Sequence, residues 1–179
     1  CGDGGVLVTD DEELLAQLRV LRNLGLKTRD DCVVWSHNSR LDSLQAAMLL
    51  VKLRHLEAWT DKRRANAAHY RARLAEIPQV AVPADLERAY SVYHTFVVQV
   101  ERRDELKAFL DSRRIGTAVH YPVPIHLMTA GGELGYGPGS FPVAEAQAGR
   151  ILSLPVHQDL TTEQLDAVCD STAEFYQSH

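Results

Sequence analysis

The feature that most limits how this chain can fold is one long segment with a helical pattern, which begins near Arg40 and runs to about residue 77. Its first part, residues 44–51, is apolar on nearly every side of a helix, a pattern typical of burial on more than one face. Farther along, the apolar positions narrow to one stripe. A helix that changes in this way passes from one packing unit into another. We therefore predict a linking helix over about 40–77 and a boundary near Ala58, with units over 1–58 and 59–179.

The second unit alternates strand and helix patterns. Strands are predicted over 93–100, 117–119 and 151–154, and helices over 103–114, 142–149 and from residue 161 onward. Thr161 and Gln164 form a capping box at the start of the last helix. The order β-α-β-α-β-α indicates a small α/β layer domain.

The first unit carries fewer signals. A short buried strand is predicted over 6–8, after a glycine-rich turn. Thr9 and Glu12 form a capping box before a helix that ends at Gly25. Residues 26–36 have no clean period and indicate a loop. Because the first part of the linking helix is too apolar for a helix with an open face, we expect this unit to pack against structure that lies outside the sequence.

Charge and composition exclude several classes of partner. The 179 residues carry a net charge of −5 and a pI near 5.9, so no basic field favours nucleic acid or an anionic membrane surface. No apolar run approaches the length of a membrane span. The three cysteines are scattered without a C-x-x-C pair, which argues against a disulfide scaffold or a zinc site. We expect a cytoplasmic protein without a metal, a membrane partner or a nucleic-acid partner.

The sharpest polar cluster is His37-Asn38-Ser39-Arg40, in a loop that leads into the linking helix. An amide, a hydroxyl and a guanidinium beside free backbone N–H groups suit an anion, above all a phosphate. The same residues also fit a simple helix cap, with Ser39 as the N-cap, Asp42 answering it and Arg40 as a solvated charge. Spacing alone favours the cap.

A second cluster, His120-Tyr121-Pro122-Val123-Pro124-Ile125-His126, follows the strand predicted over 117–119. Two prolines stiffen the loop, and two imidazoles and a phenol project from it, as in many substrate pockets. A packed proline turn with incidental histidines is the simpler alternative. The spacing of His120 and His126, with no acidic residue between them, is poor for a metal. No lysine has the apolar surroundings that activate an amine, and no Ser-His-Asp or Cys-His nucleophile pattern is apparent.

Five parts of the chain carry motifs of a single family. They are Gly2-Asp3-Gly4-Gly5-Val6-Leu7-Val8-Thr9, Leu21-Arg22-Asn23-Leu24-Gly25, Asn38-Ser39-Arg40-Leu41-Asp42-Ser43-Leu44-Gln45-Ala46-Ala47, the loop from His120 to His126, and Phe141-Pro142-Val143-Ala144-Glu145 with Leu152-Ser153-Leu154-Pro155. Together they resemble the DegT/DnrJ/EryC1/StrS family, the sugar aminotransferases of fold type I that depend on pyridoxal phosphate (PLP). The motifs occur in the family's order and cover essentially the whole chain, so the resemblance outweighs the simpler interpretation of both polar clusters.

The resemblance implies an α/β fold of type I, with the end of the large PLP-binding domain followed by the small C-terminal α/β domain. It also implies an enzyme of amino-sugar or antibiotic biosynthesis. Pyridoxal 5'-phosphate (PLP), held on a lysine, would take an amino group from glutamate or glutamine and deliver it to the keto carbon of a nucleotide-linked sugar. The active site would be shared between the two subunits of a homodimer.

The resemblance also assigns roles to particular residues. Asn38 would reach the cofactor phosphate of the partner subunit, and Arg40 would lie near that anion or the substrate diphosphate. His120 and Tyr121 match the loop that borders the sugar pocket, with His126 as a neighbour.

The family's lysine would lie shortly before Cys1, so no catalytic residue is expected within this sequence, and the chain alone is expected to be inactive. Either the sequence is interrupted at a lysine that carries the cofactor, or the chain is a true fragment. Two other functions stay open: transamination of a keto-cyclitol or another ketone, and a non-catalytic binding or dimerisation module.

Overall fold

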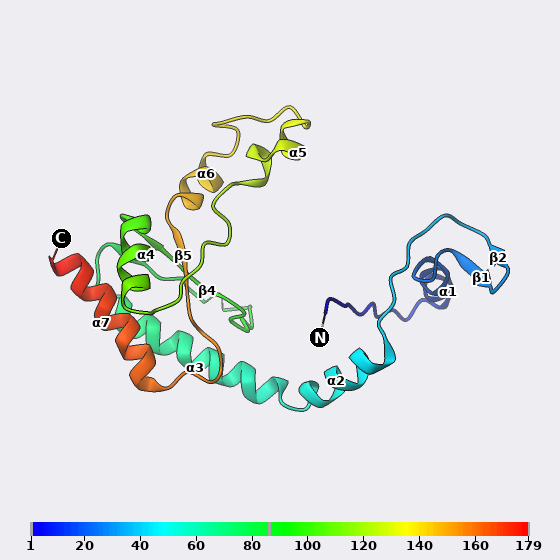
Figure 1. Cartoon of the computed structure of the whole chain (residues 1–179), viewed down its shortest axis with the longest axis horizontal. Helices are drawn as coiled ribbons and strands as arrows, with labels where there is room; N and C mark the ends of the chain where they lie inside the picture. The colour runs from blue at the N-terminus through cyan, green and yellow to red at the C-terminus, as the bar shows by residue number, and fades with distance from the viewer. Residues whose placement is uncertain (1, 86, 179) are drawn as a thin grey trace. The chain divides into compact units, whose positions relative to one another are not determined.

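The computed structural model describes residues 2–85 and 87–178, and the chain forms two compact units (Figure 1). The units divide between Leu56 and Glu57, close to the boundary expected near Ala58. Within the described ranges, no helix is both long and apolar enough to cross a bilayer. Nor do three or more His, Cys, Asp or Glu side chains in these ranges gather in a way that could hold a metal ion.

The linking helix predicted over 40–77 is wrong as a single element. The segment forms two helices, α2 (Ser43–Leu53) and α3 (Leu56–Leu74), and α2 starts only after Asp42, which keeps an extended backbone. Between the helices the N–H of His55 donates to the carbonyl of Lys52 at 3.0 Å. This bond spans three residues, as in a 3₁₀ turn, instead of the four of an α-helix, so it interrupts the α-helical hydrogen-bond pattern. Neither glycine nor proline stands at the break, so the sequence carries no breaker signal there.

The first helix, α1 (Glu12–Leu21), does not use the capping box expected at Thr9 and Glu12. Its N-cap is Asp11, whose carboxylate accepts hydrogen bonds from the N–H groups of Glu13 and Leu14 at 2.9 and 3.0 Å. The Thr9 hydroxyl instead accepts from the N–H of Asp11. An aspartate caps at least as well as a threonine, and its charge also favours the positive end of the helix dipole.

A short antiparallel hairpin, β1 (Leu26–Thr28) and β2 (Asp31–Cys32), occupies the region expected to be a loop. Gly25 leads into it with a φ of +72°, and a Cβ atom there would lie 1.5 Å from the carbonyl oxygen of Val34. Only glycine allows so close an approach in this backbone conformation. The first helix ends earlier than expected, at Leu21 with Arg22 as its C-cap, and the glycine predicted to close it instead leads into the hairpin.

The strand predicted over 6–8 does not form, because no strand in the described part of the chain lies beside it. Val6, Leu7 and Val8 are 74–91% exposed. Among the described residues of the first unit only Gly25 is buried, so this unit has no apolar core of its own. Its apolar side chains can be buried only by structure beyond these residues. That this unit packs against such structure therefore stays a prediction.

The second unit is built on an antiparallel sheet of β3 (Val80–Ala81), β4 (Phe96–Val100) and β5 (Ile151–Leu154), in the order β3-β4-β5. The strand expected over 117–119 is reduced to one bridge, Ala118 to Ser153. The chain leaves the sheet there for the proline-containing loop, and proline cannot donate to a ladder. Ser153 consequently has a backbone neighbour on each side, Val97 of β4 and Ala118.

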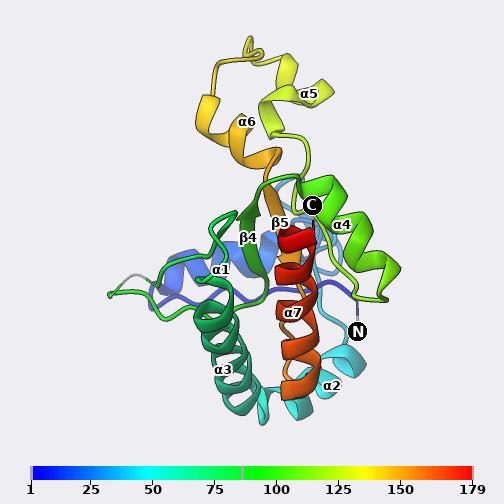
Figure 2. The same cartoon turned by 90° about the vertical axis from the view of Figure 1, so that its left-hand side faces the viewer.

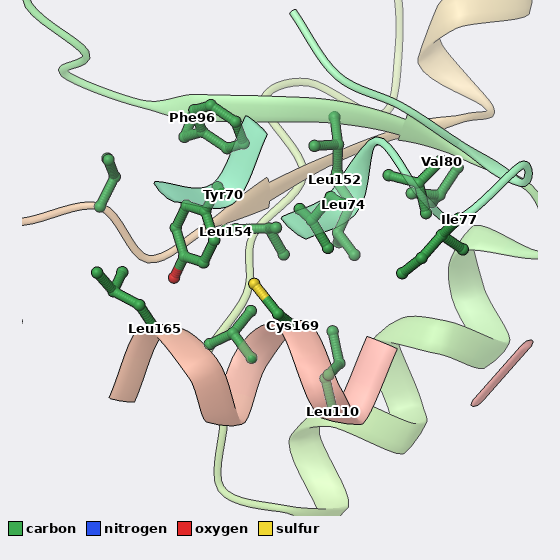
Figure 3. Packing of buried hydrophobic residues seen from close by; sticks show 14 of the residues in the cluster. Tyr70, Leu74, Ile77, Val80, Phe96, Leu110, Leu152, Leu154, Leu165 and Cys169 are labelled. Carbon is green, nitrogen blue, oxygen red and sulfur yellow. The ribbon is translucent and has the colours of Figure 1, made fainter. Parts of the chain in front are cut away.

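Three helices cover the sheet: α3, α4 (Arg103–Ser112) and α7 (Thr162–Ser178) (Figure 2). The capping box predicted for α7 is confirmed by reciprocal bonds, Thr161 N–H to Gln164 Oε1 at 3.0 Å and Gln164 N–H to Thr161 Oγ1 at 3.3 Å. Side chains from these helices meet the inner face of the sheet in one apolar cluster (Figure 3). The cluster includes Tyr70, Leu74, Ile77, Val80, Phe96, Leu110, Leu152, Leu154, Leu165 and Cys169.

Between the Ala118 bridge and β5 the chain makes an excursion beyond the end of the sheet, over residues 120–148 (Figures 1 and 2). It contains a 3₁₀ turn, η1 (Ile125–Leu127), and the short helices α5 (Thr129–Gly132) and α6 (Pro142–Ala148). Pro142 begins α6, where its fixed φ and missing N–H are tolerated. This excursion carries the second polar cluster.

Candidate functional site

In the first unit, the backbone of the His37–Arg40 cluster is held against the end of α1. Asn38 forms a bridge with Asn23, and the carbonyl of His37 accepts from the N–H of Leu24 at 3.1 Å. The N–H of Ser39 donates to the carbonyl of Arg22 at 2.9 Å. Ser39 is therefore not the N-cap of the following helix. That position belongs to Asp42, whose side chain makes no capping bond.

The side chains of Asn38 and Arg40 form a small donor group. The Nε atom of Arg40 donates to Oδ1 of Asn38 at 2.8 Å, which leaves the amide nitrogen of Asn38 and the terminal nitrogens of Arg40 as donors. They line an open hollow of about 510 Å³ together with Arg22, Leu41, Asp42 and Ser43. Two guanidinium groups and an amide near the start of a helix are suited to binding a phosphate. Among the lining residues only Asp42 has an acidic side chain.

In the second unit, His120 and Tyr121 stand where the chain leaves the sheet. The Nδ1 atom of His120 lies 2.9 Å from Oγ of Ser153, and the His120 and Tyr121 rings meet edge to face with 5.5 Å between centroids. The phenol of Tyr121 is 71% exposed. Both rings line a largely apolar cavity of about 610 Å³. Most of its other walls come from the excursion, including Tyr136 and Phe141, and the rest from Val97 of β4 and Ile151 of β5.

The third predicted substrate residue, His126, lies on the same cavity but is itself buried and already has a side-chain partner. Its side chain is 8% exposed, and its Nε2 atom lies 2.8 Å from Oε1 of Glu145. Glu145 also accepts from the N–H of Gly139 at 2.9 Å and from the N–H of Phe141 at 3.2 Å. The hydrogen bond from Gly139, followed by those from His126 and Phe141, holds the pKa of the Glu145 carboxyl below its usual range. His126 thus ties η1 to α6.

Sequence reasoning missed two functional-site residues, Glu145 and Ser153. Both lie within motifs that the resemblance used, but each was taken only as part of a helix or a strand. Their partners are distant in sequence, 19 residues for Glu145 with His126 and 33 for Ser153 with His120. A side chain that pairs over such a distance leaves no local signal.

Comparison with known proteins decides the family. The sequence pattern of the DegT/DnrJ/EryC1/StrS aminotransferase family matches residues 1–173. The chain belongs to this family. It is 46% identical over 167 residues to the erythromycin biosynthesis sensory transduction protein EryC1 of Saccharopolyspora erythraea, covering 93% of this chain and 46% of that protein.

Streptomyces venezuelae supplies two further comparisons, one of sequence and one of structure. The dTDP-3-amino-3,4,6-trideoxy-alpha-D-glucose transaminase is 43% identical over 174 residues, covering 97% of this chain and 46% of the enzyme. The crystal structure of DesV superposes with a TM-score of 0.89 at 42% identity, covering 94% of this chain and 45% of that one. The chain therefore spans about half the length of these relatives.

These comparisons confirm the expected fold class, that of the fold type I sugar aminotransferases, and the expected enzyme family. Membership also implies pyridoxal 5'-phosphate as the cofactor. The donors Asn38 and Arg40 fit the phosphate of that group, since they present N–H groups and positive charge with nothing to complement an apolar ring. The residues described here that could hold the cofactor are thus suited to its phosphate end.

Proposed function

We propose that the protein to which this chain belongs transfers an amino group from glutamate or glutamine to the keto carbon of a nucleotide-linked sugar. The observation that carries the proposal is the 43% identity, over 97% of the chain, to a transaminase of a dTDP-linked deoxysugar. The arrangement of the two polar clusters supports it, because one presents donors suited to a phosphate and the other lines a cavity.

For cofactor binding, we propose that Asn38 and Arg40 act on the partner subunit's cofactor in a homodimer. The amide nitrogen of Asn38 would donate to a phosphate oxygen, while the bond from Arg40 Nε to Asn38 Oδ1 holds that amide in place. Charge-assisted bonds of this kind are worth about 1.5–3 kcal/mol each. PLP, when bound, supplies the stabilisation of negative charge on the reacting carbon, and the protein supplies binding and orientation.

For substrate binding, we propose that His120 and Tyr121 orient the sugar ring. Pro122 and Pro124 limit how far the loop can swing, so side chains fixed there lose little entropy when a ligand binds. The main proton carrier is expected to be the lysine upstream of Cys1. His126 contributes by shaping the cavity wall, since its Nε2 atom is already engaged by Glu145.

A cytoplasmic location agrees with the thiols, because Cys32 and Cys169 are both free. A cytoplasmic location would also place the enzyme in the same compartment as its proposed amino donor, glutamate or glutamine.

The test is a panel of ketones offered to the purified full-length protein with glutamate or glutamine. Bound cofactor is checked first, by visible absorbance and by intact mass. Turnover of nucleotide-linked keto-sugars supports the proposal. Turnover of keto-cyclitols alone would show that the substrate is a cyclitol rather than a nucleotide-linked sugar. A protein that binds no cofactor and converts no ketone would favour a non-catalytic module.

A further inference from the structure

We propose that Ser153 is a positioning residue, which fixes the imidazole of His120 so that its Nε2 atom can donate a hydrogen bond to an oxygen of the keto-sugar. This inference rests on the proposed function and deepens it, because it names a residue through which His120 acts.

The backbone of Ser153 is held by neighbours on both sides. Ser153 lies on β5 opposite Val97 of β4, and on its other side it exchanges two backbone bonds with Ala118. The N–H of Ser153 donates to the carbonyl of Ala118 at 2.7 Å, and the N–H of Ala118 donates back at 3.2 Å. The residue is also only 6% exposed, so Ser153 presents its Oγ atom from a firmly held position on β5.

The imidazole of His120 contacts this Oγ atom through only one of its two nitrogens. Nδ1 lies 2.9 Å from Oγ of Ser153, and the edge-to-face contact with Tyr121 limits rotation of the ring. Among the described residues no hydrogen bond reaches Nε2. When the serine hydroxyl donates to Nδ1, the neutral ring carries its proton on Nε2. That N–H is then a donor directed by Ser153, suited to a carbonyl or hydroxyl oxygen of a sugar.

Ser153 also differs from the other polar groups near the cavity. Glu145 and His126 bind each other, and Glu145 also accepts from backbone N–H groups, so this pair stabilises the cavity wall rather than an exposed ring. Ser153 is hydrogen-bonded to a side chain that is itself open to a ligand. Removing the Ser153 hydroxyl would leave the backbone of His120 in place and would remove only the hydrogen bond that orients its imidazole ring.

The experiment compares the two half-reactions of the full-length enzyme by single-turnover kinetics. We expect Ser153→Ala to slow the keto-sugar half-reaction about tenfold, which corresponds to ~1.4 kcal/mol, and to leave the glutamate half-reaction unchanged. Ser153→Thr retains a hydroxyl and is expected to restore most of the rate. The matched control is Ser171→Ala on α7, since Ser171 is equally buried at 6% exposure and lies outside the cavity lining.

A double-mutant cycle separates positioning from a general structural effect. In the His120→Ala background, Ser153→Ala is expected to cause no further loss. An additional tenfold loss in that background, or equal damage to both half-reactions, would overturn the proposal.

A readout that does not depend on turnover is the ¹⁵N chemical shifts of the His120 ring in the full-length protein. The wild type is expected to show one neutral tautomer with the proton on Nε2, and Ser153→Ala a mixture of both. A mixture already in the wild type would contradict the inference. If the wild type converts no keto-sugar, the proposed function fails, and this measurement still decides whether Ser153 fixes the ring.

Discussion

Nε2 of His126 lies 2.8 Å from Oε1 of Glu145, and the same carboxylate accepts two backbone N–H groups from the chain between them. One side chain of α6 thereby closes the excursion that forms most of the cavity wall. The edge-to-face contact of His126 with Phe141, at 4.8 Å between centroids, also packs η1 against the start of α6. The shape of the cavity depends on this pair.

Replacing Glu145 with Gln is expected to loosen the excursion. Glutamine keeps the size of the side chain but loses the charge that strengthens the hydrogen bonds from its three donors, His126, Gly139 and Phe141. We predict several-fold faster proteolytic cleavage within residues 127–141 and a lower melting temperature. Glu163→Gln at the start of α7 is the control, because it removes one carboxylate elsewhere in the same unit. Equal cleavage rates for wild type and Glu145→Gln would contradict the assigned role.

The lowered pKa of Glu145 makes the excursion sensitive to acid. Because the folded pKa lies below the ordinary value of 4.5, the carboxylate contributes stability that is present above that value and is lost as the pH falls through the lowered folded pKa. Amide exchange in residues 137–141, compared between pH 7 and pH 3.5 after correction for intrinsic rates, is expected to show greater opening at the acid end. Glu145→Gln should flatten this dependence. An unchanged pH dependence in that variant would show that other carboxylates are responsible.

Replacing Asn38 with Ala is expected to weaken cofactor binding by about tenfold or more, since it removes a donor to a doubly charged phosphate worth roughly 1.5–3 kcal/mol. Titration of the full-length apoprotein with PLP, followed by absorbance, measures the change in Kd. Asn23→Ala is the matched control, because Asn23 forms the backbone bridge with Asn38 but does not line the hollow. Unchanged affinity in Asn38→Ala would refute the assignment.

The apolar surface of α2 is expected to be covered in the assembled protein. Leu44, Leu50 and Val51 are 56–74% exposed in this chain, far more than an apolar helix face in a finished core. We predict that Leu50→Lys in the full-length protein disrupts assembly, measured as loss of the dimer in analytical ultracentrifugation. Val92→Lys, at a half-exposed apolar position of the second unit, should leave the dimer intact. A stable dimer in Leu50→Lys would show that this face is not part of the packing.

His120→Ala is expected to impair the keto-sugar half-reaction and to spare amino transfer from glutamate. The side chain lines the cavity of the second unit, whereas Asn38, the residue proposed to bind the cofactor phosphate, belongs to the first unit. Single-turnover measurement of both halves checks this. Equal damage to both would assign His120 to the cofactor site, and no damage to either would return it to a packed turn.

The sequence predicted those elements whose signals are local. The reciprocal cap at Thr161 and Gln164, the strand β5 and the extent of α4 all follow from residues that are neighbours in the chain. The break before α3 was missed because ordinary helix-forming residues stand there. The strand over 6–8 was predicted from apolar residues whose pairing partner is not among the described residues.

The candidate site divides in the same way. His120, Tyr121, Asn38 and Arg40 could be proposed from the sequence because they stand together in short motifs. Ser153 and Glu145 could not be, because each acts on a histidine that only the fold brings near. Pairings of this kind depend on the register of β5 against Ala118 and on the path of the excursion. Neither can be predicted from residues that are neighbours in the sequence.

The most direct test of the central claim follows the nitrogen atom itself. The full-length protein with bound PLP is incubated with ¹⁵N-labelled glutamate and a dTDP-linked keto-sugar, and the sugar product is analysed by mass spectrometry. If the protein is a sugar aminotransferase, the product is an amino sugar that carries the ¹⁵N label, formed together with 2-oxoglutarate. An unaltered keto-sugar, with the same holoprotein failing to label any nucleotide-linked ketone from glutamate or glutamine, would contradict the account.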